Sequence, residues 1–251
     1  MCGKVKHGTI SLASLVILFI SMLTWLSFGR ASKLVFGTIS FSGEKFDRAG
    51  GLAYLALQLI KRTSVEVEPE PQSLALNSNQ VFDYPLLIAS GSGSFPVPGQ
   101  TELALLRRHL RRGGTLLLDD IDPDSGNFTA SAVKLAKALF PHERLEPVPK
   151  SHTVFKSFYL LDRAYGRKMQ DSRLLGVNLD GRMALFISRN DLLGAFQQDN
   201  LGGWALPSSP GGDEQRELAL RLAINIVYYA LCLDYKDDQV HAPFIIERRR
   251  K

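Results

Sequence analysis

The sequence has few of the residues that several classes of protein require. It contains only two cysteines in 251 residues, Cys2 and Cys232, which excludes a disulfide framework and a metal site built from cysteine alone. We expect no bond between them, and we expect Cys232 to be a small buried hydrophobic residue. The central part of the chain also has no large excess of positive or negative charge, because much of the net charge of +5 comes from Lys4, Lys6 and the terminal run 248–251. A near-neutral body argues against a nucleic-acid-binding protein.

One long run without charge stands near the amino terminus. Ile10–Phe28 spans nineteen residues, enough for a helix to cross a bilayer core of about 30 Å. The amino group and two lysines precede this run, and one arginine and one lysine follow it, so the bias places the amino terminus in the cytoplasm and the rest outside. We expect residues 1–32 to be an uncleaved anchor in the inner membrane. A signal peptide that is cleaved for secretion is the alternative.

From residue 33 onward, short β-rich runs alternate with helical stretches. Strands are expected at Leu34–Ile39, Val65–Glu68, Pro85–Ala89, Thr115–Leu118, Leu174–Leu179 and Met183–Ile187, and helices at Gly50–Arg62, Thr101–Arg112, Ser131–Phe140 and Glu214–Tyr229. Asp180-Gly181 between the last two strands predicts a hairpin, whereas Asn200–Gly212 is expected to be a long loop. The pattern predicts one α/β domain over residues 33–240, with a mainly parallel sheet between helices, and a basic tail over 241–251.

Ligands of such sheets bind beyond the carboxyl ends of the strands, where this sequence places two polar runs. The first is Ser90-Gly91-Ser92-Gly93-Ser94. Its glycines permit a tight turn and its serines can bond the backbone of that turn. An anion-binding loop before a helix, or a serine nucleophile, are the alternatives. Further along, we expect Asp191 to cap a helix or turn and Asn225 to satisfy a buried backbone group.

The second polar run is acidic and covers residues 119–124. Asp120, Asp122 and Asp124 are candidate ligands for Mg²⁺ or Ca²⁺, which prefer oxygen ligands. The run resembles the start of an EF-hand loop, but serines occupy the positions that require glycine and glutamate. We therefore expect a turn whose carboxylates cap the following helix, and we predict no cofactor. A bound cation is the alternative.

Histidines offer the remaining catalytic candidates. His152 could act as a general base with Ser92 and Asp120, although a lone histidine is more often a hydrogen-bonded structural residue. His109 lies among the arginines of residues 107–112, and we expect this set to form a solvated helix face.

Several segments together resemble the family known as domain of unknown function 4159. They are Asp83–Leu87, Gly91–Phe95, Leu106–Leu110, Arg112–Asp120, Ser151–His152, Phe155, Phe158–Tyr159, Ser188–Leu192 and Asn225–Leu231. The resemblance covers roughly residues 33–240. It implies a flavodoxin-like fold of the class I glutamine amidotransferase type, in bacterial membrane-associated proteins found beside MoxR-type ATPases and von Willebrand A-domain proteins. It carries no known activity, and the turn after Ala89 lacks the cysteine that an amidotransferase requires.

These observations favour a non-catalytic, membrane-anchored module that binds a partner protein or small ligand. The candidate binding residues are Ser90, Gly91, Ser92, Gly93, Asp119, Asp120 and Asp191. The alternative is a hydrolase or transferase that uses the strand-end loops 90–94 and 119–124. Such an enzyme requires Ser92, Asp120 and His152 to converge in one pocket.

Overall fold

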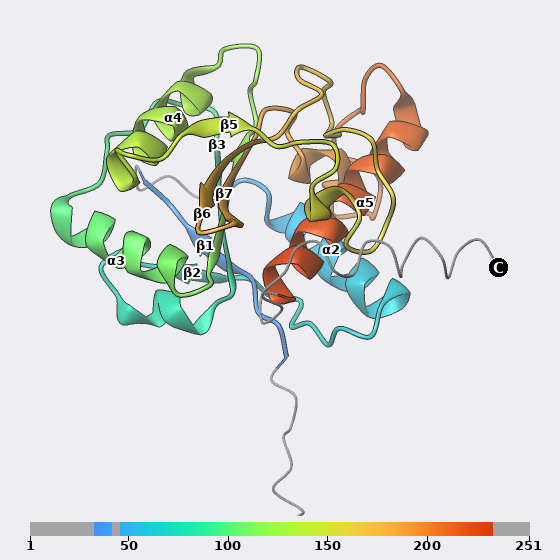
Figure 1. Ribbon diagram of the computed structural model, residues 1–251. Helices are drawn as coiled ribbons and strands as arrows, with labels where there is room; N and C mark the ends of the chain where they lie inside the picture. Colours follow the sequence, from blue (N-terminus) through green and yellow to red (C-terminus); the bar gives the residue numbers. More distant parts are fainter. Residues whose placement is uncertain (1–32, 42–45, 233–251) are drawn as a thin grey trace, which may run out of the picture. The chain divides into compact units, whose positions relative to one another are not determined.

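The structure, a computed structural model, describes residues 33–41 and 46–232 (Figure 1). Its seven strands form one sheet in the order β2-β1-β3-β4-β7-β6-β5. The strands are β1 (Gly37–Ile39), β2 (Gln72–Leu74), β3 (Leu86–Gly91), β4 (Thr115–Asp120), β5 (Leu145–Pro147), β6 (Leu175–Leu179) and β7 (Arg182–Ser188). Only β6 runs against the others, since it pairs antiparallel with both β5 and β7. The mainly parallel sheet predicted from the sequence is confirmed.

Helices cover both faces of this sheet. They are α2 (Ala49–Arg62), α3 (Gln100–Arg111), α4 (Asn127–Leu139) and α5 (Gly212–Leu231), with the short 3-10 helices η1 (Asn79–Asp83), η2 (Thr153–Phe155) and η3 (Leu193–Phe196). α2 and α5 lie on one face, and α3 and α4 on the other (Figure 1). Strand side chains alternate between the two cores: Leu86 and Ile88 pack towards α2 and α5, whereas Leu87 and Ala89 pack towards α3 and α4. The sheet is therefore buried on both sides.

The predicted hairpin joins β6 to β7. Asp180 and Gly181 have φ values of 53° and 89°, as a mirror-image two-residue turn requires. The side-chain oxygen of Asn178 accepts a hydrogen bond from the Gly181 amide at 2.9 Å. β7 also pairs in parallel with β4, so the hairpin extends the parallel sheet.

Short elements at the sheet edges differ from the prediction. β2 and β5 were not expected, because three residues are too few to show a period of two. Val65–Glu68 was expected to be a strand, but it supplies only a bridge between Leu34 and Val67. α4 begins at Asn127, before the expected start at Ser131.

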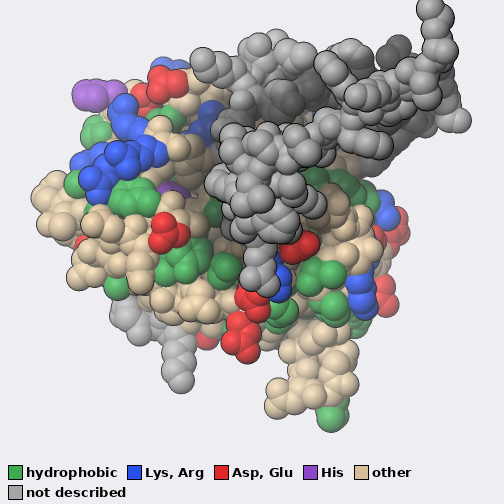
Figure 2. Space-filling view, turned by 90° about the horizontal axis from the view of Figure 1, so that it is seen from below, with side chains coloured by type: hydrophobic (Ala, Val, Ile, Leu, Met, Phe, Trp, Pro, Cys, Tyr) green, Lys and Arg blue, Asp and Glu red, His purple; other side chains and the backbone are tan. Residues whose placement is uncertain are grey.

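The expected solvated face of α3 is wrong at two positions. His109 is only 3% exposed, because it lies three residues after Leu106 on the helix face that meets the sheet. Arg107 donates hydrogen bonds to the last carbonyls of α4, at 2.8 Å to Leu139 and 2.9 Å to Ala138. The remaining arginines of this helix end are exposed, and Figure 2 shows a group of Lys and Arg side chains beside hydrophobic ones.

The segment after β5 packs against α5. Asn225 in α5 accepts hydrogen bonds from the amides of Phe158 at 3.1 Å and Tyr159 at 2.7 Å, and it donates to the Tyr159 carbonyl at 2.8 Å. The prediction that Asn225 satisfies buried backbone groups is confirmed. Cys232 contradicts its prediction, since it follows the last turn of α5 and is exposed.

No helix in the described ranges has the length and apolar composition needed to cross a bilayer. α5 is the longest with twenty residues, and five of them are charged. The predicted span Ile10–Phe28 and the basic tail 241–251 lie outside the described residues.

Candidate functional site

The strands β1, β3, β4 and β7 end together at one margin of the sheet, here called the carboxyl edge. Strand register places Ser90 beside Asp119, and Asp119 beside Ser188. All three point to the α2/α5 face, because the residue two positions before each packs into that core. Two of the predicted site residues, Ser90 and Asp119, are therefore neighbours.

Asp119 is a fully buried carboxylate that fixes the chain after β7. Its two oxygens accept hydrogen bonds from the amides of Leu192 at 2.8 Å and Leu193 at 2.9 Å. Burial and the nearby carboxylate of Asp191 raise the pKa of Asp119 well above its usual range, against the opposing effect of these amides and the Ser188 hydroxyl. The carboxylate thus clamps η3 onto the end of β4.

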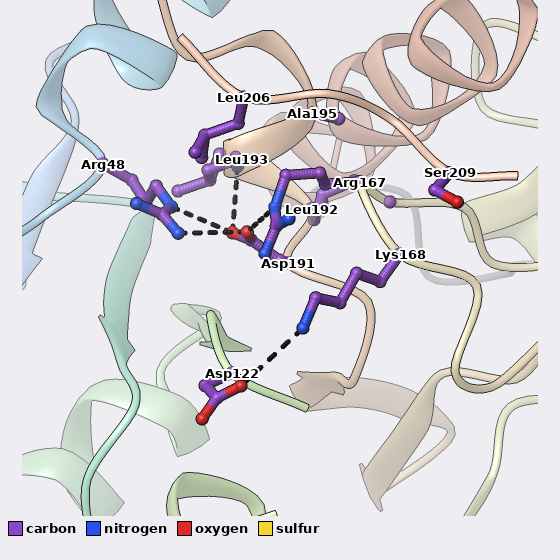
Figure 3. Close-up of polar contacts among 12 residues, drawn as sticks. Arg48, Asp122, Arg167, Lys168, Asp191, Leu192, Leu193, Ala195, Leu206 and Ser209 are labelled. Carbon is purple, nitrogen blue, oxygen red and sulfur yellow. Dashed lines mark hydrogen bonds and ion pairs between the residues drawn. The ribbon is translucent and has the colours of Figure 1, made fainter. Parts of the chain in front are cut away.

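Asp191 lies between two arginines at this edge (Figure 3). Arg48 binds it through two nitrogens, with Nε 2.9 Å from Oδ1 and Nη2 3.0 Å from Oδ2, and Arg167 Nε binds Oδ2. The Gly194 amide donates to Oδ1 at 3.2 Å, so the expectation that Asp191 caps a turn is confirmed. A Cβ at position 194 would lie 2.3 Å from this carboxylate, which explains the glycine. The sequence gives no indication that these two arginines pair with Asp191, because Arg48 is 143 positions and Arg167 is 24 positions away from it.

Asp120 points to the opposite face and caps α4. Its carboxylate accepts hydrogen bonds from the amides of Asp122 at 3.0 Å and Thr129 at 3.1 Å, and from the Thr129 hydroxyl at 2.5 Å. Burial raises the pKa of Asp120, although these hydrogen bonds oppose the shift. Thr129 is in the first turn of α4, so the prediction that this acidic run caps the following helix is confirmed for Asp120.

Asp122 and Asp124 stand at the rim of the edge beside Lys168, and Figure 3 shows the Lys168 side chain directed towards Asp122. Lys168 Nζ contacts the Asp124 carboxylate and lies 3.7 Å from Asp122. Asp120 is turned away into α4, so the three candidate ligands do not converge. Over the residues that the structure describes, no three His, Cys, Asp or Glu side chains are grouped for a metal ion.

The three candidate catalytic residues are separated. Ser92 is exposed in the loop after β3. The His152 ring packs 6.4 Å from the Phe186 ring and 5.2 Å from the Tyr229 ring in the α2/α5 core, where burial lowers its pKa to about 4. Since Asp120 lies on the α3/α4 face, the sheet stands between Asp120 and His152. These side chains form no common pocket.

A small crevice opens between the ends of β1 and β3. Its lining consists of Ile39, Ser40, Phe41, Ala89, Ser90, Gly91, Gly93, Phe95 and Phe128. Phe95 stacks on Phe41 at 4.6 Å and packs against Phe128 at 5.1 Å, so aromatic rings fill most of the space. The remaining volume of about 10 Å³ is enough for roughly one water molecule. Among the described residues, the buried Ser90 hydroxyl has no hydrogen-bond partner.

Residues 198–204, here called the Trp204 loop, include the first five residues of the predicted long loop, Asn200–Gly212. A bridge between Gln198 and Trp204 closes the loop, and Asp199 Oδ1 accepts hydrogen bonds from the amides of Leu201 at 2.9 Å and Gly203 at 2.8 Å. The loop follows η3 and packs near the first turn of α2, at the carboxyl edge. Leu201 at its tip is 96% exposed.

Trp204 fixes the loop to the domain. Its ring meets Tyr54 edge-on at 5.2 Å, and the Arg216 guanidinium lies 4.5 Å from its centre. The indole is still 40% exposed. A tryptophan within a run of glycine, proline and serine was the one feature of the sequence that could have drawn attention here.

The protein is an α/β domain with a seven-stranded, mainly parallel sheet. At the carboxyl edge of this sheet, buried aspartates are paired with arginines and backbone amides. The family model described as Domain of unknown function (DUF4159) matches residues 35–231, and the chain belongs to that family. The match runs from the approach to β1 to the end of α5 and includes the whole carboxyl edge. No curated protein matches the chain.

Proposed function

We propose that this protein is a non-catalytic, partner-binding module of the bacterial cell envelope. Residues 10–28 anchor it in the inner membrane, with the α/β domain outside the cytoplasm. The observation that carries the proposal is the Trp204 loop, which holds an almost fully exposed leucine on an ordered support at the carboxyl edge.

An ordered loop with exposed apolar side chains is suited to binding. Fixing the loop before association lowers the entropy lost when a partner binds. Tryptophan is among the residues enriched at the centres of interfaces, and Trp204 is already held by Tyr54 and Arg216. Leu201 adds apolar area that water covers in the free protein. We therefore assign Trp204 as the anchor of the interface and Leu201 as its apolar neighbour.

The crevice supports a protein partner over a small ligand. Sites for small molecules have volumes of roughly 300–1,000 Å³, whereas about 10 Å³ remains between β1 and β3. We infer a flavodoxin-like fold from the order β2-β1-β3-β4-β7, in which ligands bind at the strand ends where the order reverses. Phe41, Phe95 and Phe128 fill the space at these strand ends. We therefore expect a partner to bind on the outer surface of the carboxyl edge.

Family resemblance suggests two kinds of partner, a MoxR-type ATPase and a von Willebrand A-domain protein. An ATPase uses cytoplasmic ATP, so the von Willebrand A-domain protein is the partner that suits a domain outside the cytoplasm. The choice of partner therefore depends on the proposed orientation of the domain in the membrane.

Photo-crosslinking from position 201 tests this interface. A benzophenone amino acid at Leu201 of the full chain, expressed in its native membrane, should crosslink to a von Willebrand A-domain protein. Trp204→Ala should reduce the yield at least tenfold, whereas Leu160→Asp, a change at another leucine that is 49% exposed, should leave it intact. Absence of a protein crosslink, or equal loss in both variants, would refute the interface.

Topology is tested separately. Alkaline phosphatase fused after Lys251 should be active, because it folds outside the cytoplasm, and a fused fluorophore that matures only in the cytoplasm should stay dark. The reverse pattern would overturn the proposed orientation.

A hydrolase or transferase is the second candidate function, and one observation favours it. The Ser90 hydroxyl is buried without a described partner beside Asp119, whose raised pKa suits a general base. A fluorophosphonate probe, which labels activated serines, separates the two functions. A binding module should remain unlabelled, whereas labelling that disappears in Ser90→Ala would establish the enzyme.

A further inference from the structure

Helix α2 lies beside α5 on one face of the sheet, and its outer side is exposed (Figure 1). Four apolar residues form this side, because their spacing of four, four and three positions places them in one row along a helix. They are Ala49, Ala53, Leu57 and Ile60, here called the α2 stripe. Leu57 is 43% exposed and Ile60 47%. A surface helix normally has a polar outer side, so an exposed apolar row indicates a binding surface.

Side-chain size changes along the α2 stripe. Its first two members are alanines, and its last two are a leucine and an isoleucine. When two such helices lie antiparallel, Ala49 meets Ile60 of the second copy, and Ala53 meets Leu57, so that large side chains fill the space beside small ones. A parallel pair would set leucine against leucine and leave space between the alanines. The α2 stripe is therefore complementary to itself in the antiparallel direction, as a twofold interface requires.

The charges at the two ends of α2 match in the same direction. Asp47 lies in the turn before the helix and Lys61 in its last turn, and both are exposed. Within residues 33–41 and 46–232, neither takes part in an ion pair. In an antiparallel pair, each Asp47 faces the Lys61 of the second copy. Two copies therefore offer each other one opposite charge at each end of the contact.

One twofold axis satisfies the apolar and the ionic contacts together. The midpoint of Asp47 and Lys61 along the chain is Tyr54, and the midpoints of the two apolar pairs fall at Leu55 or between Tyr54 and Leu55. With the rise of an α-helix, these midpoints lie within about 1.5 Å of one another. Size and charge thus specify the same axis, and the occupant that matches both is a second copy of α2.

We propose that two copies of this protein form a dimer through the α2 stripe, with the two helices antiparallel about a twofold axis near Tyr54 and Leu55. The dimer is closed, because both copies use the same face, so this contact adds no third copy. One helix face from each copy is a small interface, so the dimer dissociates in the micromolar range. The pairing requires neither the membrane anchor nor the Trp204 loop of the proposed function.

Crosslinking tests the pairing and its direction. In the full chain with Cys2→Ser and Cys232→Ser, a bismaleimide of about 8 Å matches the separation of packed helices. It should join two copies that carry Ala53→Cys, because their cysteines are offset by only about 5 Å along the helix. It should not join two copies that carry Lys61→Cys, because those cysteines lie about 20 Å apart.

Three results of the crosslinking would overturn the proposal. They are linkage of the Lys61→Cys copies to the same or a greater extent, linkage of neither variant, and linkage of Ala53→Cys in its native membrane to a different protein in place of a second copy. The first result would indicate a parallel pair or chance collision, and the last would assign the α2 stripe to another partner.

Sedimentation of the full chain in mild detergent measures the strength of the pairing. The wild type should change from monomer to dimer as its concentration rises through the micromolar range. Leu57→Asp places an unpaired charge in the contact and should weaken the dimer at least tenfold. Val133→Asp, the same kind of change at a residue of α4 that is 39% exposed, should leave the dimer intact. A monomer at every concentration, or equal loss in both variants, would refute the dimer.

Exchange of the end charges tests the contact without changing the α2 stripe. Lys61→Glu alone should weaken the dimer about tenfold, because two attractive contacts become repulsive. Adding Asp47→Lys restores opposite charges at both ends and should recover most of the affinity. Loss of folding cannot produce such a recovery, since it requires that position 47 of one copy meets position 61 of the other. A double variant as weak as Lys61→Glu would overturn the antiparallel pairing.

Discussion

Replacing Asp191 by asparagine tests whether the carboxyl edge depends on one buried charge. Asparagine keeps the shape of the side chain and tolerates the φ of 50° at this position. It removes the negative charge between Arg48 and Arg167, whose side chains are only 13% and 15% exposed. Two guanidiniums would then face a neutral amide whose N–H₂ group cannot accept their hydrogen bonds.

The expected loss of stability follows from that geometry. Removing one partner of a buried ion pair costs about 3–5 kcal/mol, and the partial exposure of both arginines favours the lower end. A loss of about 3 kcal/mol should lower the melting temperature of a domain of this size by about 6–12 °C. Circular dichroism of the full chain in mild detergent measures the change.

Two further variants make the result specific. Asp162→Asn breaks an exposed pair with Arg163 and should cost less than about 0.5 kcal/mol. Adding Arg48→Gln to Asp191→Asn should recover part of the loss, because it removes one of the two unpaired charges. A melting temperature of Asp191→Asn within about 2 °C of the wild type, or an equal loss in Asp162→Asn, would refute this account of the edge.

Three other predictions concern the capping carboxylate, a buried histidine and glutamine. Asp120→Asn should destabilise the domain by about 1 kcal/mol through a weakened cap on α4, and millimolar Mg²⁺ or Ca²⁺ should leave the wild-type melting temperature unchanged; a rise of several degrees that the variant lacks would contradict this. His109 has a folded pKa of about 4, below its usual 6.5, so the unfolded chain takes up a proton first and wild-type stability should fall as the pH drops from 6.5 to 4. His109→Gln should remove about 2–3 kcal/mol of that fall, and melting curves of equal pH dependence would argue against it. Purified protein should release no ammonia from glutamine, because no cysteine follows Ala89, and release that is lost in Ser90→Ala would overturn the prediction.

Local patterns made most of the framework predictable. The apolar runs of β3 and β4, the leucine spacing of α3 and the Asp180-Gly181 turn each depend on residues close in sequence. The three-residue strands β2 and β5 could not be predicted, since they form only because the neighbouring strands β1 and β6 offer backbone groups to pair with. His109 was predicted incorrectly from its charged neighbours, although its spacing from Leu106 already placed it on the buried face.

The polar network was harder to predict, because its partners are distant in sequence. Asp120 was assigned as a cap since its helix follows directly. Asp191 was assigned to a turn, but Arg48 comes from the start of α2 and Arg167 from the segment before β6, and only the folded sheet brings them together. The fixed conformation of the Trp204 loop could not be predicted from the sequence either, because it depends on which backbone amides donate hydrogen bonds to Asp199.

The two outermost strands have a consequence for crowding. β2 and β5 have only three residues each, and Pro147 in β5 has no N–H to offer a neighbouring chain. Proteins held on a membrane meet one another far more often than in solution, since they diffuse in two dimensions. Sheets with long open margins would join into ribbons under those conditions. On the membrane surface that we propose for this protein, margins this short would let many copies lie side by side with their sheets separate.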